Sequence, residues 1–191
     1  MTPIGAFTPY SLRFGGSSNL VMKGILSVIC LFWKVSFLGI HLFPTVLVFA
    51  GCSPLYFIFK NSDPVGITDF LGVVIVIGAV LIEAVADNQL LKYRKARKSG
   101  VVSGILDTGL WGYSRHPNYF GEIMFWVGIF IFSYPIFQGG EYWIITGAIL
   151  MIILFVFISI PMMEKRQLTK EGYPEYRKRV SALIPLPPKK L

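Results

Sequence analysis

The chain has 191 residues, of which 54% are hydrophobic and only 15% are charged, and its formal net charge is +8. A soluble domain of this length carries more charge, and several apolar runs approach the ~20 residues that cross a bilayer. This composition excludes an ordinary soluble enzyme. The basic residues flank the apolar runs, where they set membrane topology, so the net charge does not indicate a nucleic-acid binder.

We therefore predict an all-α protein: a multi-pass transmembrane helix bundle with about four spans and a cytoplasmic C-terminal tail. The apolar run 20–33 is short and is interrupted by Lys23. Residues 1–35 are accordingly expected to form a short N-terminal segment with an interfacial or partial apolar helix, and residues 36–191 the membrane domain. The predicted spans, in chain order, are 36–59, 66–86, 118–136 and 142–161.

The basic residues predict the topology. The segments 87–117 and 162–191 contain 14 of the 18 lysines and arginines, whereas the loops 60–65 and 137–141 contain only Lys60. Cytoplasmic loops are enriched in lysine and arginine, so we expect the two basic segments on the cytoplasmic side. The membrane is expected to be the endoplasmic reticulum in a eukaryote and the inner membrane in a bacterium.

A polar motif stands at the entrance of the third predicted span. Residues 109–122 read GLWGYSRHPNYFGE, with Arg115, Asn118 and Glu122 spaced by three and four residues, which predicts one shared helical face. A guanidinium, an amide and a carboxylate in a row suit the phosphate, base edge and hydroxyl groups of a nucleotide. The alternative interpretation is that this stretch is a belt of residues at the membrane–water interface, in which Arg115 and His116 contact lipid phosphates. That interpretation leaves Asn118 and Glu122 unexplained.

A second polar group lies at the end of the span 66–86. Glu83 and Asp87 are four residues apart, and Arg94 follows on the same face if the helix continues. Asp87 and Arg94 alone are equally explained as solvated charges at a helix end. Glu83 lies inside apolar sequence, where a carboxylate needs a partner or a proton.

These motifs resemble those of a known superfamily. The stretch 109–122 is similar to the C-terminal signature of the membrane-bound steroid 5-alpha-reductases, and most similar to the uncharacterised steroid reductase-like branch (DUF1295). EAVADNQLLKYRK (83–95) and EGYPEYRKRVSALIPLPP (171–188) resemble the same branch. The steroid reductases often have an amide where this chain has Glu83. The resemblance implies an NADPH site formed by the following residues: Glu83, Asp87, Arg94, Arg115, His116, Asn118, Tyr119, Glu122, Arg166 and Tyr173.

The resemblance also implies the activity. The expected protein is an NADPH-dependent CH–CH oxidoreductase of the lipid bilayer that reduces a carbon–carbon double bond of a hydrophobic lipid substrate, a steroid or isoprenoid enone. The catalytic residues are not assigned, and no metal is expected. No glycine-rich loop follows a strand, so a Rossmann site is excluded.

Two other functions stay open. An S-adenosylmethionine-dependent methyltransferase of the isoprenylcysteine carboxyl type shares the Arg-His-Pro-x-Tyr core, but usually has a small and an apolar residue at the positions of Asn118 and Glu122. A truncated, non-catalytic relative is suggested by the short N-terminus, because family members usually have more spans before residue 36.

Overall fold

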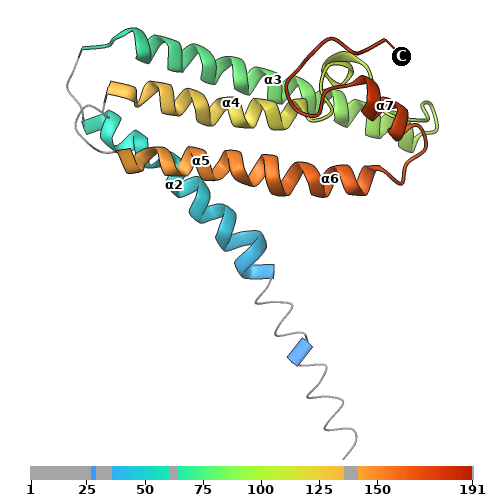
Figure 1. Cartoon of the computed structure of the whole chain (residues 1–191), viewed down its shortest axis with the longest axis horizontal. Coiled ribbons are helices and arrows are strands. Elements are labelled where there is room, and N and C mark those ends of the chain that lie inside the picture. The colour runs from blue at the N-terminus through green and yellow to red at the C-terminus, as the bar shows by residue number, and fades with distance from the viewer. Residues whose placement is uncertain (1–26, 29–35, 61–63, 136–141, 191) are drawn as a thin grey trace, which may run out of the picture. The chain divides into compact units, whose positions relative to one another are not determined.

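The computed structural model describes residues 27–28, 36–60, 64–135 and 142–190 (Figure 1). The chain divides into two compact units, residues 1–45 and 46–191. The described residues of the first unit include a π-helix, η1 (Phe37–Leu42), and the start of α2 (Phe43–Lys60). The predicted N-terminal segment 1–35 lies outside the described residues, apart from positions 27 and 28, so its helix stays a prediction.

The second unit contains the membrane helices and the C-terminal tail. Its elements after α2 are α3 (Ile67–Lys98), the 3-10 helix η2 (Gly109–Gly112), α4 (Pro117–Phe132), the 3-10 helix η4 (Tyr142–Ile144), α5 (Ile145–Ile153), the π-helix η5 (Leu154–Ser159), α6 (Ile160–Gln167) and α7 (Tyr173–Arg179). The elements from η4 to α6 follow one another without a break and form one long helix.

Among the described residues, three helices are long and apolar enough to cross a membrane: Phe43–Lys60, Ile67–Lys98 and Tyr142–Gln167. With α4, a shorter apolar helix of 16 residues, they confirm the predicted all-α multi-pass bundle. Three helix ends differ clearly from the prediction, one of them in the last helix, which continues to Gln167 and not only to residue 161. α3 continues to Lys98 because the polar residues after position 86 are mostly good helix formers, with no glycine or proline before Gly100. α4 ends at Phe132 because Ser133 caps it and Pro135 follows.

Small residues bring α3 and α4 together as antiparallel neighbours (Figure 1). Gly72 and Ala79 on α3, and Gly121 and Gly128 on α4, are buried and seven residues apart. A Cβ atom added to Gly121 would lie 2.9 Å from the carbonyl oxygen of Ala79, so only glycine allows this approach. Small residues at helix contacts let membrane helices pack closely without a hydrophobic driving force.

A second contact joins α2, α4 and α5. Leu47, Trp126, Ala148 and Met151 form a buried apolar cluster, one or two residues from each helix. Gly147 lies so close to the backbone of α2 that an added Cβ would overlap it. The three long helices are thus bound together through α4.

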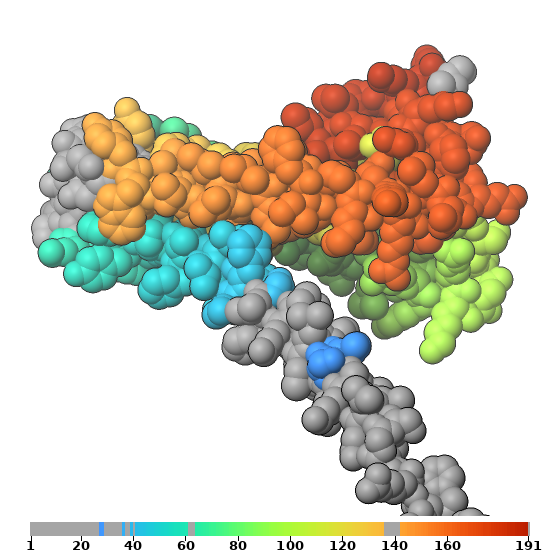
Figure 2. All heavy atoms as spheres, turned by 60° about the horizontal axis from the view of Figure 1, so that its bottom comes forward, coloured from blue at the N-terminus to red at the C-terminus, as the bar shows by residue number. Residues whose placement is uncertain are grey.

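The C-terminal segment, residues 173–186, folds back onto the loop before α4, residues 99–116, which connects α3 to α4. Tyr173, Tyr176 and Val180 form a buried cluster against Ile105. In Figure 2 this segment and α6 form one mass beside that loop. The tail is therefore a packed part of the second unit.

The predicted topology can be tested at two exposed positions. Val65, just before α3, and Ser99, just after it, lie at opposite ends of a 32-residue helix. Single cysteines at these positions, with Cys30 and Cys52 replaced by serine, should be labelled by an impermeant thiol reagent from opposite sides, Ser99 from the cytoplasm. Labelling of both from the same side contradicts α3 as a span.

The close contact of α3 and α4 predicts a large effect of one methyl group. Gly121→Ala should lower the free energy of unfolding by ~1–3 kcal/mol, because its Cβ would collide with the backbone of α3. Gly78→Ala is the matched control, since nothing lies within 4 Å of a Cβ there. Thermal unfolding in detergent measures both, and equal stability of the two variants would refute the contact.

Candidate functional site

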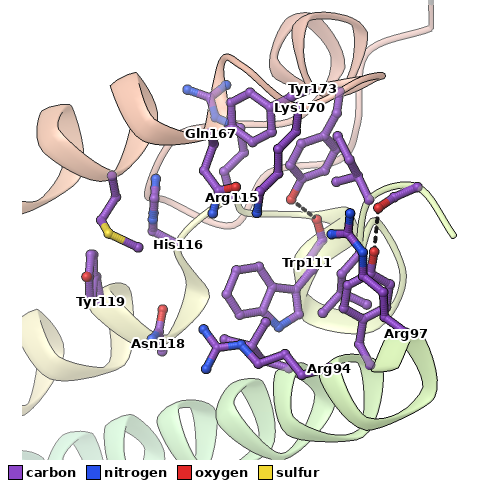
Figure 3. A pocket seen from close by; sticks show the side chains of 17 residues that line it. Arg94, Arg97, Trp111, Arg115, His116, Asn118, Tyr119, Gln167, Lys170 and Tyr173 are labelled. Atoms are coloured by element: carbon purple, nitrogen blue, oxygen red, sulfur yellow. Dashed lines mark hydrogen bonds between the residues drawn. The ribbon is translucent and has the colours of Figure 1, made fainter. Parts of the chain in front are cut away.

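A cavity of about 200 Å³ lies where the end of α3, the loop before α4 and the C-terminal segment meet (Figure 3). Aromatic rings and cations together form its walls; the rings include Tyr93, Trp111 and Tyr176. Six of the ten predicted cofactor residues line it: Arg94, Arg115, His116, Asn118, Tyr119 and Tyr173. Segments far apart in the sequence thus meet at one place.

The loop before α4 is held by α3 and by the tail. Trp111 Nε1 donates a hydrogen bond to the carbonyl of Ala86 (3.1 Å), and Leu110 N–H donates one to the side chain of Gln89 (3.0 Å). On the other side, Arg115 N–H bonds the carbonyl of Ser181 (2.9 Å). The loop between them is therefore fixed rather than free.

Arg115 lies in this loop, not on α4, which begins at Pro117. Its Nε donates to Glu164 (2.9 Å), and its Nη1 donates to the carbonyls of Arg177 and Val180 (both 2.7 Å). The expectation that Arg115 shares one helical face with Asn118 and Glu122 is therefore wrong. Most of its donors are occupied by the protein, although its side chain still borders the cavity.

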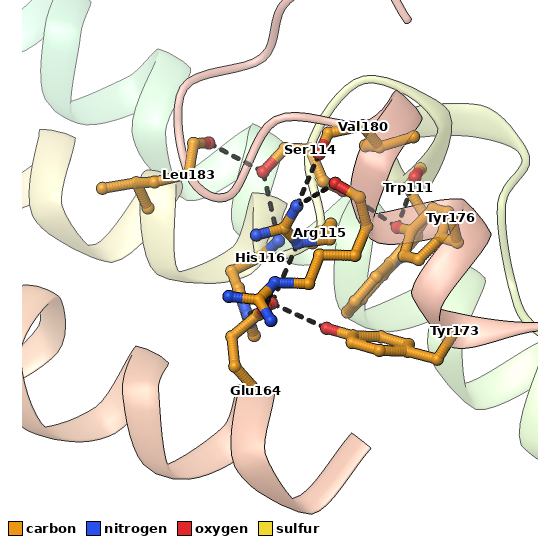
Figure 4. Close-up of polar contacts among 10 residues, drawn as sticks. Trp111, Ser114, Arg115, His116, Glu164, Tyr173, Tyr176, Val180 and Leu183 are labelled. Atoms are coloured by element: carbon orange, nitrogen blue, oxygen red, sulfur yellow. Dashed lines mark hydrogen bonds and ion pairs between the residues drawn. The ribbon is translucent and has the colours of Figure 1, made fainter. Parts of the chain in front are cut away.

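Glu164, near the end of α6, connects the loop to the tail (Figure 4). Its side chain is buried, and Oε1 lies within hydrogen-bond distance of Arg115 Nε (2.9 Å), His116 Nε2 (3.0 Å) and the Tyr173 hydroxyl (2.6 Å). Burial, followed by the hydrogen bond to Glu164, raises the pKa of Tyr173, so its hydroxyl stays a donor over the physiological range. The carboxylate therefore holds in place three side chains that line the cavity: Arg115, His116 and Tyr173.

A ring stack continues this wall. The rings of His116 and Tyr119 lie nearly parallel, with centroids 5.4 Å apart and an interplanar angle of 6°. Tyr119 in turn contacts Phe155 of η5 (5.2 Å). The end of the loop and the start of α4 thus contribute two stacked rings to the lining of the cavity.

Four cations lie near one another beside the cavity. Arg94 and Arg97 of α3 and Lys170 line it, whereas Arg166 of α6 lies close to Lys170 without lining it. Within the described part of the chain, none of them forms an ion pair with an acidic side chain. Lys170 is exposed overall, but partial desolvation and then the positive charges of Arg97, Arg166 and Arg94 lower its pKa. Four cations that repel one another, next to a cavity, have the charge and position that suit an anion.

The predicted carboxyl groups lie nearer the apolar sequence, Glu83 and Asp87 on α3 and Glu122 on α4. Asn118 Nδ2 donates to Asp87 Oδ1 (3.2 Å), and Trp126 Nε1 donates to Glu122 Oε1 (3.0 Å). The side chains of Glu83 and Glu122 lie close to each other where α3 and α4 pack together. Asp87 and Arg94 line an adjoining pocket, whereas neither pocket is lined by Glu83 or Glu122.

The predicted set did not include several residues of the site, among them Glu164 and Lys170. Glu164 is a single carboxylate at the end of an apolar helix, the same signal that marked Glu122. Lys170 carried no local signal, because the guanidinium groups around it come from α3 and α6.

Comparison with known proteins gives one match. A family model described as "Protein of unknown function (DUF1295)" matches residues 22–180. No curated protein matches the chain, and no solved structure does.

The cation cluster predicts a pH-dependent affinity for anions. An anion is bound best while Lys170 is protonated, so affinity for inorganic pyrophosphate should fall as pH rises through the lowered pKa of Lys170, below its ordinary 10.5. Lys170→Arg should keep the affinity and lose this pH dependence, whereas Lys170→Met should lower affinity about tenfold at neutral pH. Titration calorimetry in detergent measures both, and an unchanged affinity of Lys170→Met would remove Lys170 from the site.

Proposed function

We propose that this chain, which belongs to the DUF1295 family of proteins of unknown function, is a membrane reductase of the steroid 5-alpha-reductase superfamily that uses NADPH to reduce a carbon–carbon double bond of a lipid. The observation that carries the proposal is the group of unpaired cations beside an aromatic cavity, at the end of helices apolar enough to cross a membrane. The chemistry of the ligand follows from three features of the site.

The first feature is charge. NADPH carries a pyrophosphate and a 2′-phosphate, and several guanidinium groups suit these phosphates through paired hydrogen bonds. Arg94, Arg97 and Arg166 are the guanidinium groups available, since Arg115 is engaged by the protein. The cavity itself, about 200 Å³, is large enough for one part of a dinucleotide, so the rest would extend along α3.

The second feature is a stripe along α3. Glu83, Asp87, Leu90, Arg94 and Arg97 are spaced by four and three residues, which places them on one face. From Glu83 to Arg97 the stripe rises about 21 Å at 1.5 Å per residue. Its cations suit phosphates, and its carboxylates, with Asn118, suit ribose hydroxyls and a carboxamide. A dinucleotide would then lie with its phosphates toward the water and its nicotinamide toward the bilayer.

The third feature is the apolar surface around Glu83, at the end of the stripe that carries the carboxylates. Val80, Leu81 and Val85, next to Glu83, are exposed apolar side chains that face lipid when the helix is in a bilayer. A lipid enone could approach here from the membrane. The nicotinamide would deliver a hydride to the β-carbon of the enone, and a proton would go to the α-carbon. The protein's part is to bind and orient the two molecules.

The cation cluster also separates the proposal from methyl transfer. S-adenosylmethionine carries a net positive charge through its sulfonium group, and four unpaired cations would repel it. Asn118 and Glu122 favour the same choice, since the methyltransferases usually have a small and an apolar residue at these positions.

Nucleotide binding to purified protein tests the function. NADPH should bind more tightly than NADH, and S-adenosylmethionine should not compete. Glu122→Gln should weaken NADPH binding by roughly 10–100-fold, because a charged hydrogen bond contributes ~1.5–3 kcal/mol. The glutamine can still accept the hydrogen bond from Trp126, so the fold should be unaffected.

Glu175→Gln, a change of the same chemistry at an exposed position of α7, is the matched control and should not alter affinity. Fluorescence titration of the reduced nicotinamide gives each dissociation constant. Equal affinity for NADPH and NADH, or binding of S-adenosylmethionine alone, would refute the proposed cofactor.

A further inference from the structure

Glu164 is the point where the C-terminal segment is attached to the membrane helices (Figure 4). It is only 7% exposed, and three groups surround its Oε1 within hydrogen-bond distance. Two of them, on Arg115 and His116, come from the loop before α4. The third, on Tyr173, comes from the tail.

The second oxygen strengthens the attachment. Glu164 Oε2 has no hydrogen-bond partner within the described residues, and it lies 3.3 Å from Nε of Arg177 in an ion pair. Arg177 also belongs to the tail. A buried carboxylate is costly unless it is paired, so removal of the tail would take away two of the four groups that pair with Glu164.

The same contacts build the cavity. Arg115, His116 and Tyr173 each contact Glu164 and each line the cavity wall. Arg115 also bonds the carbonyls of Arg177 and Val180, so the loop and the tail are held in one arrangement. A tail detached from Glu164 would leave the cavity without the side formed by Tyr173 and Tyr176.

We propose that Glu164 is a positioning residue that couples docking of the C-terminal segment, residues 173–186, to ligand binding in the cavity. Glu164 does not touch the ligand; it acts through Arg115, His116 and Tyr173. Because coupling is reciprocal, a bound anion stabilises the docked tail as much as the docked tail stabilises the anion. The identity of the ligand as NADPH rests on the proposed function, whereas the docking contact does not.

Cysteine accessibility measures docking without any ligand. Val180 is 5% exposed in the docked tail, so Val180→Cys, with Cys30 and Cys52 replaced by serine, should react slowly with a thiol reagent. Adding Glu164→Gln should raise the labelling rate at least tenfold, because the charge that attracts Arg115 and Arg177 is lost. The matched control Glu175→Gln should leave the rate unchanged. If Val180→Cys is labelled at the same rate with and without Glu164→Gln, the proposed attachment is overturned.

A milder variant guards against loss of the whole fold. Tyr173→Phe removes one hydroxyl from Glu164 and keeps the ring packed against Tyr176 and Ile105. It should raise the labelling rate by a smaller factor, with an unchanged melting temperature of the membrane helices. No change in rate for Tyr173→Phe would count against the tyrosine as part of the attachment.

Ligand protection measures the coupling. Saturating NADPH should slow labelling of Val180→Cys severalfold, and Glu164→Gln should raise the dissociation constant of NADPH by a similar factor. If NADPH does not bind, the proposed function fails, and inorganic pyrophosphate replaces it as the probe of the cation cluster. Protection by either anion supports the coupling, and absence of protection by both overturns it.

Discussion

The arrangement of this site depends on one buried carboxylate. Glu164 brings together two segments: the loop before α4, which lies about fifty residues earlier in the sequence, and the C-terminal tail, which begins about ten residues later. Each of these segments has few apolar contacts of its own, the tail chiefly Tyr173, Tyr176 and Val180 against Ile105. A charge that must be paired supplies a directional constraint that apolar packing does not, because only one arrangement satisfies its geometry.

The helices and the tail contribute different things to the site. α3 and α4 are packed through glycine and alanine, so their relative position is set by backbone contact. The polar residues of α3, from Glu83 to Arg97, stand on this rigid support. The tail is held by a small apolar cluster around Ile105, by hydrogen bonds and by two ion pairs, Arg177–Glu164 and Arg179–Asp107, a smaller set of contacts than the one that joins α3 and α4. A site with one rigid side, formed by α3 and α4, and one more weakly attached side, formed by the tail, suits the binding of a large ligand.

Much of this was predictable from sequence, and the failures have physical reasons. The spans followed from apolar length, and Arg94, His116, Asn118, Tyr119 and Tyr173 were placed together by their motifs. Arg115 was misplaced because spacing alone does not show that the helix begins at Pro117, or that a partner lies in α6. Glu164 was not assigned to the site because two of its partners, Arg115 and His116, are almost fifty residues away in sequence. Local patterns predict helices well, whereas long-range ion pairs require the fold.

α3 is one unbroken helix of 32 residues whose first two thirds are apolar and whose end is basic. Such a helix can pass from the hydrocarbon interior of a membrane into water without a break. In the proposed function, a water-soluble cofactor and a lipid substrate would meet along this helix while each stays in its own phase. The boundary between the phases, rather than a closed chamber, would bring the two molecules together, and the thickness of the bilayer would determine how deep that meeting point lies.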